Sequence, residues 1–142
     1  MKIMKKKMTN YELVQIVNTM KGLANKKYPQ KVSYTLMKTI VALEKESEIY
    51  TKQLEALVKE YQEADKIVLD KDRKPILNES GLPQIKKEYA EDFGKELTEL
   101  LNFIVEIELP TIKADNLDYS DEKYDVLTPA ELILIMNLIC DE

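Results

Sequence analysis

The longest regular pattern of apolar residues lies between residues 32 and 63. Positions alternate in steps of four and three, and Ser47 is the one polar member of the series Leu36, Ile40, Leu43, Ser47, Tyr50, Leu54, Leu57 and Tyr61. This heptad seam predicts a helix that packs along a narrow stripe, and neither Gly nor Pro interrupts it. Roughly 30 residues at 1.5 Å each give a helix on the order of 45–50 Å long. Such a helix needs a partner helix from this chain or from another copy.

Two further helices are predicted on either side of the long one. The first covers residues 9–24, where Thr9 and Glu12 fit a capping box and apolar residues follow at helical spacing. The second covers residues 84–101, whose apolar positions recur in steps of four and three. Its natural role is to fold back along the long helix.

The clearest local signal in the chain marks the start of a C-terminal helix. Thr128 is suited to the N-cap, Pro129 to the first helical position, and Glu131 completes a capping box. The helix is predicted to end at Ile139. Because it is apolar almost all round, we expect it to be buried as the plug of the core. The alternative is that the helix docks into a partner and is only half covered in the free protein.

Two segments have the period of two that is typical of strands. In residues 103–109 one face of the predicted strand carries Phe103, Val105, Ile107 and Leu109. The other face carries Ile104, Glu106 and Glu108, and the two glutamates are expected to face solvent. Residues 67–77 resemble two short extended pieces around a polar turn, and Pro75 restricts the second piece to a sheet edge or a loop. The segment 67–77 is therefore the first candidate to pair with 103–109. Residues 111–114 or another chain are the alternatives.

These elements predict a mainly α fold with a small β element (α+β) in a single domain, 1–142. A long antiparallel helical hairpin occupies 31–101, with an irregular or β tip at 64–83, and short helices lie at both ends. Residues 103–142 supply the strand, an acidic loop and the buried C-terminal helix. Residues 1–8, MKIMKKKM, are expected to form a basic flexible tail, since no amphipathic or base-stacking pattern accompanies the lysines.

Composition narrows the classes of function. The chain has 142 residues, of which 44% are apolar and 33% charged, so it is expected to be globular and helix-rich. A net charge of −5 argues against direct binding of nucleic acid, which needs a basic surface. The most apolar run, 132–140, is too short to span a membrane. The single cysteine excludes an internal disulfide and fits a reducing cytoplasm.

Candidate catalytic chemistry is sparse. The chain has no histidine, which removes the commonest general base and the commonest metal ligand. Cys140 lies among apolar residues and is expected to be a small core side chain. The three glycines are isolated, so no phosphate-binding loop is predicted. We therefore expect no enzyme activity and no cofactor.

Two acidic segments were weighed as metal sites. Residues 70–81 begin like a calcium loop, but Pro75 stands where such a loop needs Gly and Gly81 where it needs Glu. The acidic residues of 115–125 have no fixed spacing, so a solvated loop is the preferred interpretation. No tightly bound metal is expected.

Tyrosines are the remaining unusual feature, because the chain contains eight of them. Tyrosine is enriched at protein interfaces. The predicted partner-binding residues, taken from the seam and the acidic loop, are Tyr50, Leu54, Tyr61, Tyr119 and Tyr124. The helix over 84–101 is shorter than the seam and would leave roughly 20 Å of it uncovered. A homodimer or higher oligomer through the exposed part is therefore predicted.

Several of these segments, taken in order, resemble one known family. It comprises small proteins of unknown function from phages and prophages of Gram-positive bacteria, catalogued as domain of unknown function 1617. The resemblance covers nearly the whole chain and rests on cap and core positions. It is carried by TNYEL at 9–13, KVSY at 31–34, KEY at 59–61, ELLN at 99–102, VEI at 105–107 and LTPAEL at 127–132.

The resemblance implies a phage origin and a role during infection, and two hypotheses follow. The first is a non-enzymatic accessory protein that acts by protein–protein interaction in virion assembly or as a scaffold. It would be found in the host cytoplasm or on the virion, with a phage or host protein as its partner. The second is an inhibitor of a host defence system or host enzyme that binds through its acidic surface. The excess of 26 acidic over 21 basic residues is moderate for such a role.

Overall fold

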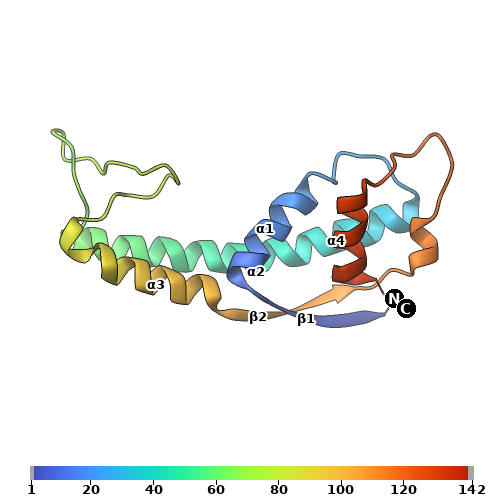
Figure 1. The fold of residues 1–142 in the computed structure, drawn as a ribbon, viewed down its shortest axis with the longest axis horizontal. Helices are drawn as coiled ribbons and strands as arrows, with labels where there is room; N and C mark the ends of the chain where they lie inside the picture. The colour runs from blue at the N-terminus through green and yellow to red at the C-terminus, as the bar shows by residue number, and fades with distance from the viewer. Residues whose placement is uncertain (1, 141–142) are drawn as a thin grey trace. The chain divides into compact units, whose positions relative to one another are not determined.

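The computed structural model describes residues 2–140 (Figure 1). The chain divides into two compact units: unit 1 contains the residues up to Ser47 and those from Ile104 onward, and unit 2 spans Glu48–Phe103. Helix α2 contributes its first part to unit 1 and the rest to unit 2. In chain order the elements are β1 (Ile3–Thr9), α1 (Asn10–Lys21), α2 (Gln30–Glu63), the 3-10 helix η1 (Lys87–Tyr89), α3 (Ala90–Asn102), β2 (Ile104–Pro110), the 3-10 helix η2 (Ala114–Leu117) and α4 (Pro129–Ile139).

This arrangement confirms the predicted fold class. The described residues are mainly helical, and the one sheet among them has two antiparallel strands. The four predicted helices are all present, and α2 and α4 have nearly the predicted bounds. Both predicted capping boxes form: the Thr9 and Thr128 hydroxyls accept hydrogen bonds from the backbone N–H of Glu12 and Glu131.

The flexible tail predicted for residues 1–8 is wrong for residues 3–8, because they belong to strand β1, and Met1 lies outside the described residues. The predicted partner of the 103–109 strand was also wrong, since β2 pairs with β1 and not with 67–77. The register sets Lys5 opposite Glu108 and Lys7 opposite Glu106 on the exposed face. Opposite charges on facing positions stabilise an antiparallel pair, so the lysines have a structural role. The prediction that both glutamates face solvent is confirmed.

Side chains on the inward face of β1 attach the strand to the rest of unit 1. Met8 is buried beneath the sheet, and Lys6, half-buried, reaches across to α4. Its Nζ donates a hydrogen bond of 2.8 Å to the backbone oxygen of Asn137, in the last turn of that helix. A cation at a helix C-terminus is favourable, because it neutralises the exposed carbonyl dipoles.

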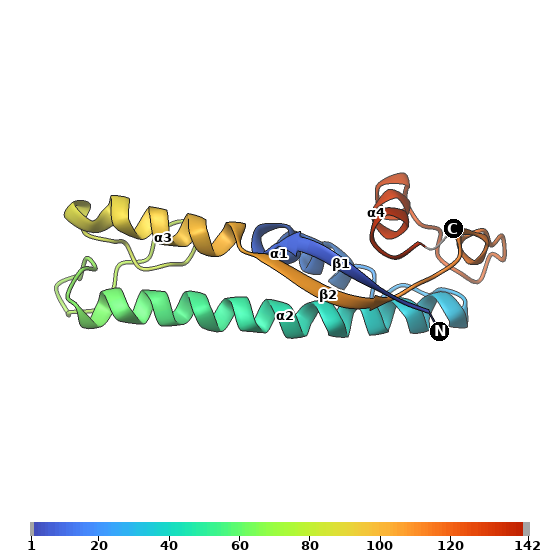
Figure 2. The same ribbon diagram turned by 90° about the horizontal axis from the view of Figure 1, so that it is seen from below.

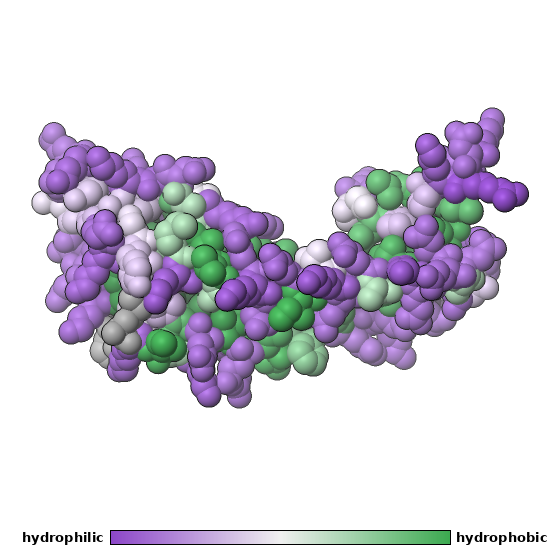
Figure 3. Space-filling view, turned by 180° about the vertical axis from the view of Figure 1, so that it is seen from behind, coloured by the Kyte–Doolittle hydropathy of each residue, from purple (hydrophilic) through white to green (hydrophobic). Residues whose placement is uncertain are grey.

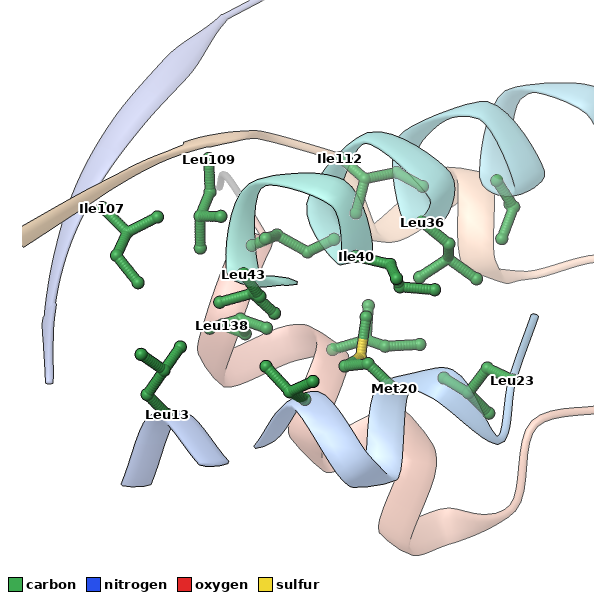
Figure 4. Packing of buried hydrophobic residues seen from close by; sticks show 14 of the residues in the cluster. Leu13, Met20, Leu23, Leu36, Ile40, Leu43, Ile107, Leu109, Ile112 and Leu138 are labelled. Carbon is green, nitrogen blue, oxygen red and sulfur yellow. The ribbon is translucent and has the colours of Figure 1, made fainter. Parts of the chain in front are cut away.

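The core of unit 1 brings together α1, the first part of α2, β2, the segment after β2, and α4 (Figure 4). Three of the predicted seam residues, Leu36, Ile40 and Leu43, face this core. The labelled side chains in the figure come from all of these elements and converge on one space: Leu13, Met20, Leu23, Leu36, Ile40, Leu43, Ile107, Leu109, Ile112 and Leu138. The predicted role of the seam as a packing stripe is therefore correct, but its covering elements differ from the predicted partner helix.

Helix α4 is only partly the plug that its composition predicts. Ile135 and Ile139 are fully buried. On the other side of the helix Ile133 is 60% exposed and Met136 is 41% exposed. The expectation of complete burial was wrong, because a single helix lying on the core covers only one of its own faces.

Unit 2 contains the second part of α2, the connecting segment and α3 (Figure 2). Its core is small: Tyr61, Ile67 and Phe93 are buried, with half-buried apolar residues packed around them. The rings of Tyr61 and Phe93 meet edge to face, 5.1 Å between centroids. This packing confirms that the helix predicted over 84–101 folds back along α2.

The segment between the two helices of unit 2 is extended but irregular. It carries isolated antiparallel bridges, Ile67 to Ile85, Leu69 to Pro75 and Leu77 to Pro83, in place of a sheet. The predicted extended pieces around a polar turn are thus present as single bridges. The turn itself is organised by Asp70, whose side chain accepts hydrogen bonds from the backbone N–H of Asp72 and Lys74.

Candidate interaction surface

The predicted partner-binding residues do not form one surface. Tyr61 is buried within unit 2, so little of its side chain is accessible to a partner. Tyr50 and Leu54 are half-buried on α2. Tyr119 and Tyr124 lie in unit 1, where their rings meet edge to face at 5.9 Å. Only the last two are brought into contact with each other by the fold.

Tyr61 is held in unit 2 by a specific polar contact. Its hydroxyl donates a hydrogen bond of 2.6 Å to the Glu96 carboxylate. That hydrogen bond, together with burial, raises the pKa of Tyr61 to about 12. The Lys66 ammonium lies 5.2 Å from the centre of the Tyr61 ring and 4.9 Å from that of Tyr89. Tyr61 is therefore a core residue whose hydroxyl and ring make polar contacts with Glu96 and Lys66.

The acidic loop is tied to the rest of unit 1. The Asp125 carboxylate accepts a hydrogen bond of 2.6 Å from the backbone N–H of Lys27, and the Asp125 backbone oxygen accepts one from the Tyr119 hydroxyl. Within residues 2–140 no group of three or more Cys, Asp or Glu side chains is placed to hold a metal ion. The loop is therefore a hydrogen-bonded part of the fold.

The heptad seam, on which self-association was predicted, is buried at both ends and half-buried in its middle. Leu36, Ile40 and Leu43 are at most 5% exposed, because unit 1 covers them. At the other end Tyr61 is 5% exposed. Between these ends Ser47, Tyr50, Leu54 and Leu57 are half-buried, so self-association through the seam stays a prediction.

Unit 1 carries a groove that is lined mainly by apolar side chains. It has a volume of about 460 Å³ and lies between α2 and the ends of β1 and β2. Leu109, Pro110 and Ala42 form its better-buried floor. Its walls are four exposed side chains: Ile3 at 62%, and Tyr34, Met37 and Val41 at 49% each.

Sequence reasoning missed this groove. Tyr34, Met37 and Val41 follow one another in steps of three and four, so they share one face of α2. That face is distinct from the heptad seam. The signal that could have found it is a second apolar stripe on a helix whose first stripe already accounts for the core. Ile3 could not have been placed beside it without the pairing of β1.

Lysines border the groove along α2. Lys38 and Lys45 line it, and Lys31 lies one further heptad toward the start of the helix, beside Tyr34 in a neighbouring hollow. The Lys38 ammonium lies 5.2 Å from the centre of the Tyr34 ring. All three lysines are exposed, and within the part of the chain that the structure describes none of them forms an ion pair.

The comparisons with known proteins add no relative. No family model matches the chain, and neither a curated protein nor a solved structure matches it. The resemblance to the phage family stays a prediction. None of the helices within residues 2–140 combines the length and the apolar character needed to cross a membrane.

Proposed function

We propose that this chain is a non-enzymatic accessory protein that works by binding another protein, and that the groove on unit 1 is its docking surface. The observation that carries the proposal is the exposure of Ile3, Tyr34, Met37 and Val41 around one concave apolar surface. Leaving apolar side chains in water costs roughly 25 cal/mol per Å², so a gathered patch is typical of a surface that another molecule covers.

The biological setting of this binding comes from the sequence resemblance. A scaffold or assembly role during phage infection, in the host cytoplasm or on the virion, is the setting that we favour. It needs no catalytic group. The polar side chains at the groove are Lys38, Lys45 and Glu108, in company with the Tyr34 hydroxyl. This set suits recognition better than acid–base chemistry, because no histidine or paired carboxylate accompanies it.

Inhibition of a host enzyme through an acidic surface is the second proposal. The acidic loop would have to provide that surface. Two of its carboxylates are engaged within the chain, Asp125 with the Lys27 backbone and Asp121 with the Lys123 ammonium at 3.8 Å. These contacts reduce the charge that the loop can offer, so we rank this proposal below the first.

Selection of binding peptides tests the docking proposal. A library of random helical peptides is panned on the native protein, and enriched peptides are then measured on the double variant Met37→Glu/Val41→Glu. The control is Val126→Glu, which places a glutamate at another exposed apolar position of unit 1, where the side chain is 78% exposed. Thermal unfolding followed by circular dichroism checks that each variant is folded.

We expect enriched peptides to bind the native protein and the Val126→Glu control. Their affinity for the double variant should be at least about tenfold lower, and a tenfold change in affinity corresponds to about 1.4 kcal/mol of binding free energy. Peptides that bind all three proteins equally would show that the groove is not the docking surface. The same conclusion follows if panning enriches nothing.

A further inference from the structure

We propose that the partner segment which docks in this groove is an amphipathic α-helix with a row of carboxylates along one flank, lying parallel or antiparallel to α2. This inference rests on the proposed function, because it names the chemistry of the partner at the same surface. It is carried by two features of α2 that lie side by side, the apolar stripe and the lysine row.

The apolar stripe sets the shape of the partner. Tyr34, Met37 and Val41 are spaced three and four residues apart along one helix, and the floor behind them is formed by Leu109 and Pro110. Apolar residues at positions i, i+3 or i+4, and i+7 of a second helix have the same spacing, so their side chains can fill the gaps between those of α2. A groove of about 460 Å³ has room for a few such side chains.

The lysine row sets the charge of the partner. Lys31, Lys38 and Lys45 are seven residues apart, which on a helix is about 10.5 Å from each to the next. Carboxylates one heptad apart on the flank of a docked helix would meet this spacing. A row of three exposed cations without ion-pair partners in residues 2–140 contrasts with the net charge of −5 of the whole chain. Complementary charge favours an acidic partner and speeds its association.

The same features argue against a second copy of this chain as the occupant. In a two-fold antiparallel pairing of α2 helices, each flank of the stripe faces the same flank of the other copy. The row of Lys31, Lys38 and Lys45 would then lie against an identical row. Like charges that face each other across a helix pair repel one another, so this pairing is unfavourable.

A membrane with anionic lipids is also a poorer match than a helix. The apolar side chains surround a recess. On the face of the molecule drawn in Figure 3, green apolar groups are separated by purple charged ones. The adjoining sheet face carries Glu106 and Glu108 as well as Lys5 and Lys7. An anionic bilayer needs a broad basic face, and this one is mixed in charge.

Three matched peptides test the inference. Each has 21 residues with leucine at the heptad positions that form the apolar stripe, and the flanking positions are all Glu, all Gln or all Lys. Affinity for the native protein is measured by fluorescence anisotropy at two salt concentrations, and for the charge-reversed variant Lys38→Glu/Lys45→Glu. The control variant is Lys71→Glu/Lys74→Glu, which changes the charge equally on exposed residues of unit 2.

We expect the Glu peptide to bind at least about tenfold more tightly than the Gln peptide, and this advantage to shrink at high salt. The Lys38→Glu/Lys45→Glu variant should prefer the Lys peptide, and the control variant should behave as the native protein. Equal binding of all three peptides, lost in Met37→Glu/Val41→Glu, would overturn the acidic partner and leave the docking surface in place. Failure of every peptide to bind, with no peptide enriched in panning, would overturn both.

Two further measurements address the other occupants. Vesicles of phosphatidylserine and phosphatidylcholine are mixed with the native protein and with Lys38→Glu/Lys45→Glu, and we expect neither protein to sediment with them. Sedimentation equilibrium is expected to give the same mass for the native protein and for Met37→Glu/Val41→Glu. Vesicle binding that the lysine variant loses, or a dimer that the apolar variant loses, overturns the proposal.

Discussion

The two parts of helix α2 carry one continuous heptad seam, yet they lie in very different surroundings. In unit 1 the seam residues Leu36, Ile40 and Leu43 enter a cluster of 16 buried residues drawn from two strands, three helices and their connections. In unit 2 the cluster around Tyr61 has three buried residues, with Phe93 and Ile67 as the others. The periodicity of the sequence is the same in both.

The difference teaches that a seam specifies where a helix packs but not how well it is covered. Helical stability in proteins comes mostly from packing of the apolar face rather than from intrinsic propensity. The depth of cover in unit 1 comes from segments far away in sequence, such as β1 and α4. In unit 2 it comes from α3 and the bridges of the connecting segment. We therefore expect unit 1 to be the more stable part.

The largest effect is expected from Ile135→Ala in α4. Ile135 is 0% exposed and central to the core of unit 1, so truncation leaves a cavity and costs on the order of 2–5 kcal/mol. Ile133→Ala on the same helix, at 60% exposure, should cost only a few tenths of a kcal/mol. Urea unfolding followed by far-UV circular dichroism gives both values. An equal loss of unfolding free energy in both variants would show that α4 does not bury Ile135 while exposing Ile133.

A smaller and local effect is expected from Phe93→Ala in unit 2. Phe93 packs against Tyr61 in a cluster that is reached by solvent at its edges, so the loss should be about 1.5–3 kcal/mol without a sealed cavity. Amide hydrogen exchange should become faster within residues 48–103 and stay unchanged at the buried amides of α1 and α4. Faster exchange throughout the chain would mean that the two units unfold together.

A cap substitution should change the stability of unit 1 by less. Thr128→Ala removes the hydroxyl that accepts a hydrogen bond from the backbone N–H of Glu131, at a cost of about 1 kcal/mol. Thr128→Ser keeps that hydroxyl and should cost much less. Thermal unfolding of the two variants provides the measurement, and indistinguishable midpoints would show that the cap adds nothing.

The smallest expected effect is spectroscopic and concerns unit 2. The pKa of Tyr61 is raised to about 12 by its hydrogen bond to Glu96 and by burial, so this tyrosine ionises at a higher pH than the ordinary value of 10.0. Glu96→Gln removes the negative charge and should move that ionisation to lower pH. The absorbance of tyrosinate near 295 nm reports the change, with Tyr61→Phe to identify the group.

The sign of the related stability change follows from the same pKa. Tyr61 is protonated in the folded protein up to a higher pH than in the unfolded chain, whose reference value is 10.0. The stabilisation is fully present below pH 10 and is lost as the pH rises toward about 12. Tyr28, whose pKa is raised to about 12 chiefly by burial, adds a change of the same sign in unit 1.

Local patterns predicted most of the helices, because their signals lie within a few residues of one another. The boxes at Thr9 and Thr128 placed two helix starts, and unbroken periodicity placed α2. Strand β1 was missed because the three lysines at 5–7 conceal the alternation between outward Lys5 and Lys7 and inward Met8. Its pairing with β2 joins residues about a hundred positions apart, which no local pattern specifies.

The candidate surface was harder to predict than the fold for a related reason. Tyr34, Met37 and Val41 were visible in the sequence as apolar residues, but their exposure depends on which elements cover the other faces of α2. The tyrosines that were selected instead have partners inside the chain, as Tyr61 has in Glu96 and Tyr119 in Asp125. Residue type alone does not distinguish a ring that is buried in the fold from one that is open to a partner.

The place of Ile3 in the groove wall has a practical consequence for handling the protein. Any chain joined ahead of Lys2 begins next to the mouth of the groove, since Ile3 is one of its walls. An affinity tag or fluorescent protein at that end can shield the apolar stripe and mask binding. The exposed turns around Asp72 and Ser80 belong to unit 2 and do not line the groove, so a label attached there replaces no groove residue.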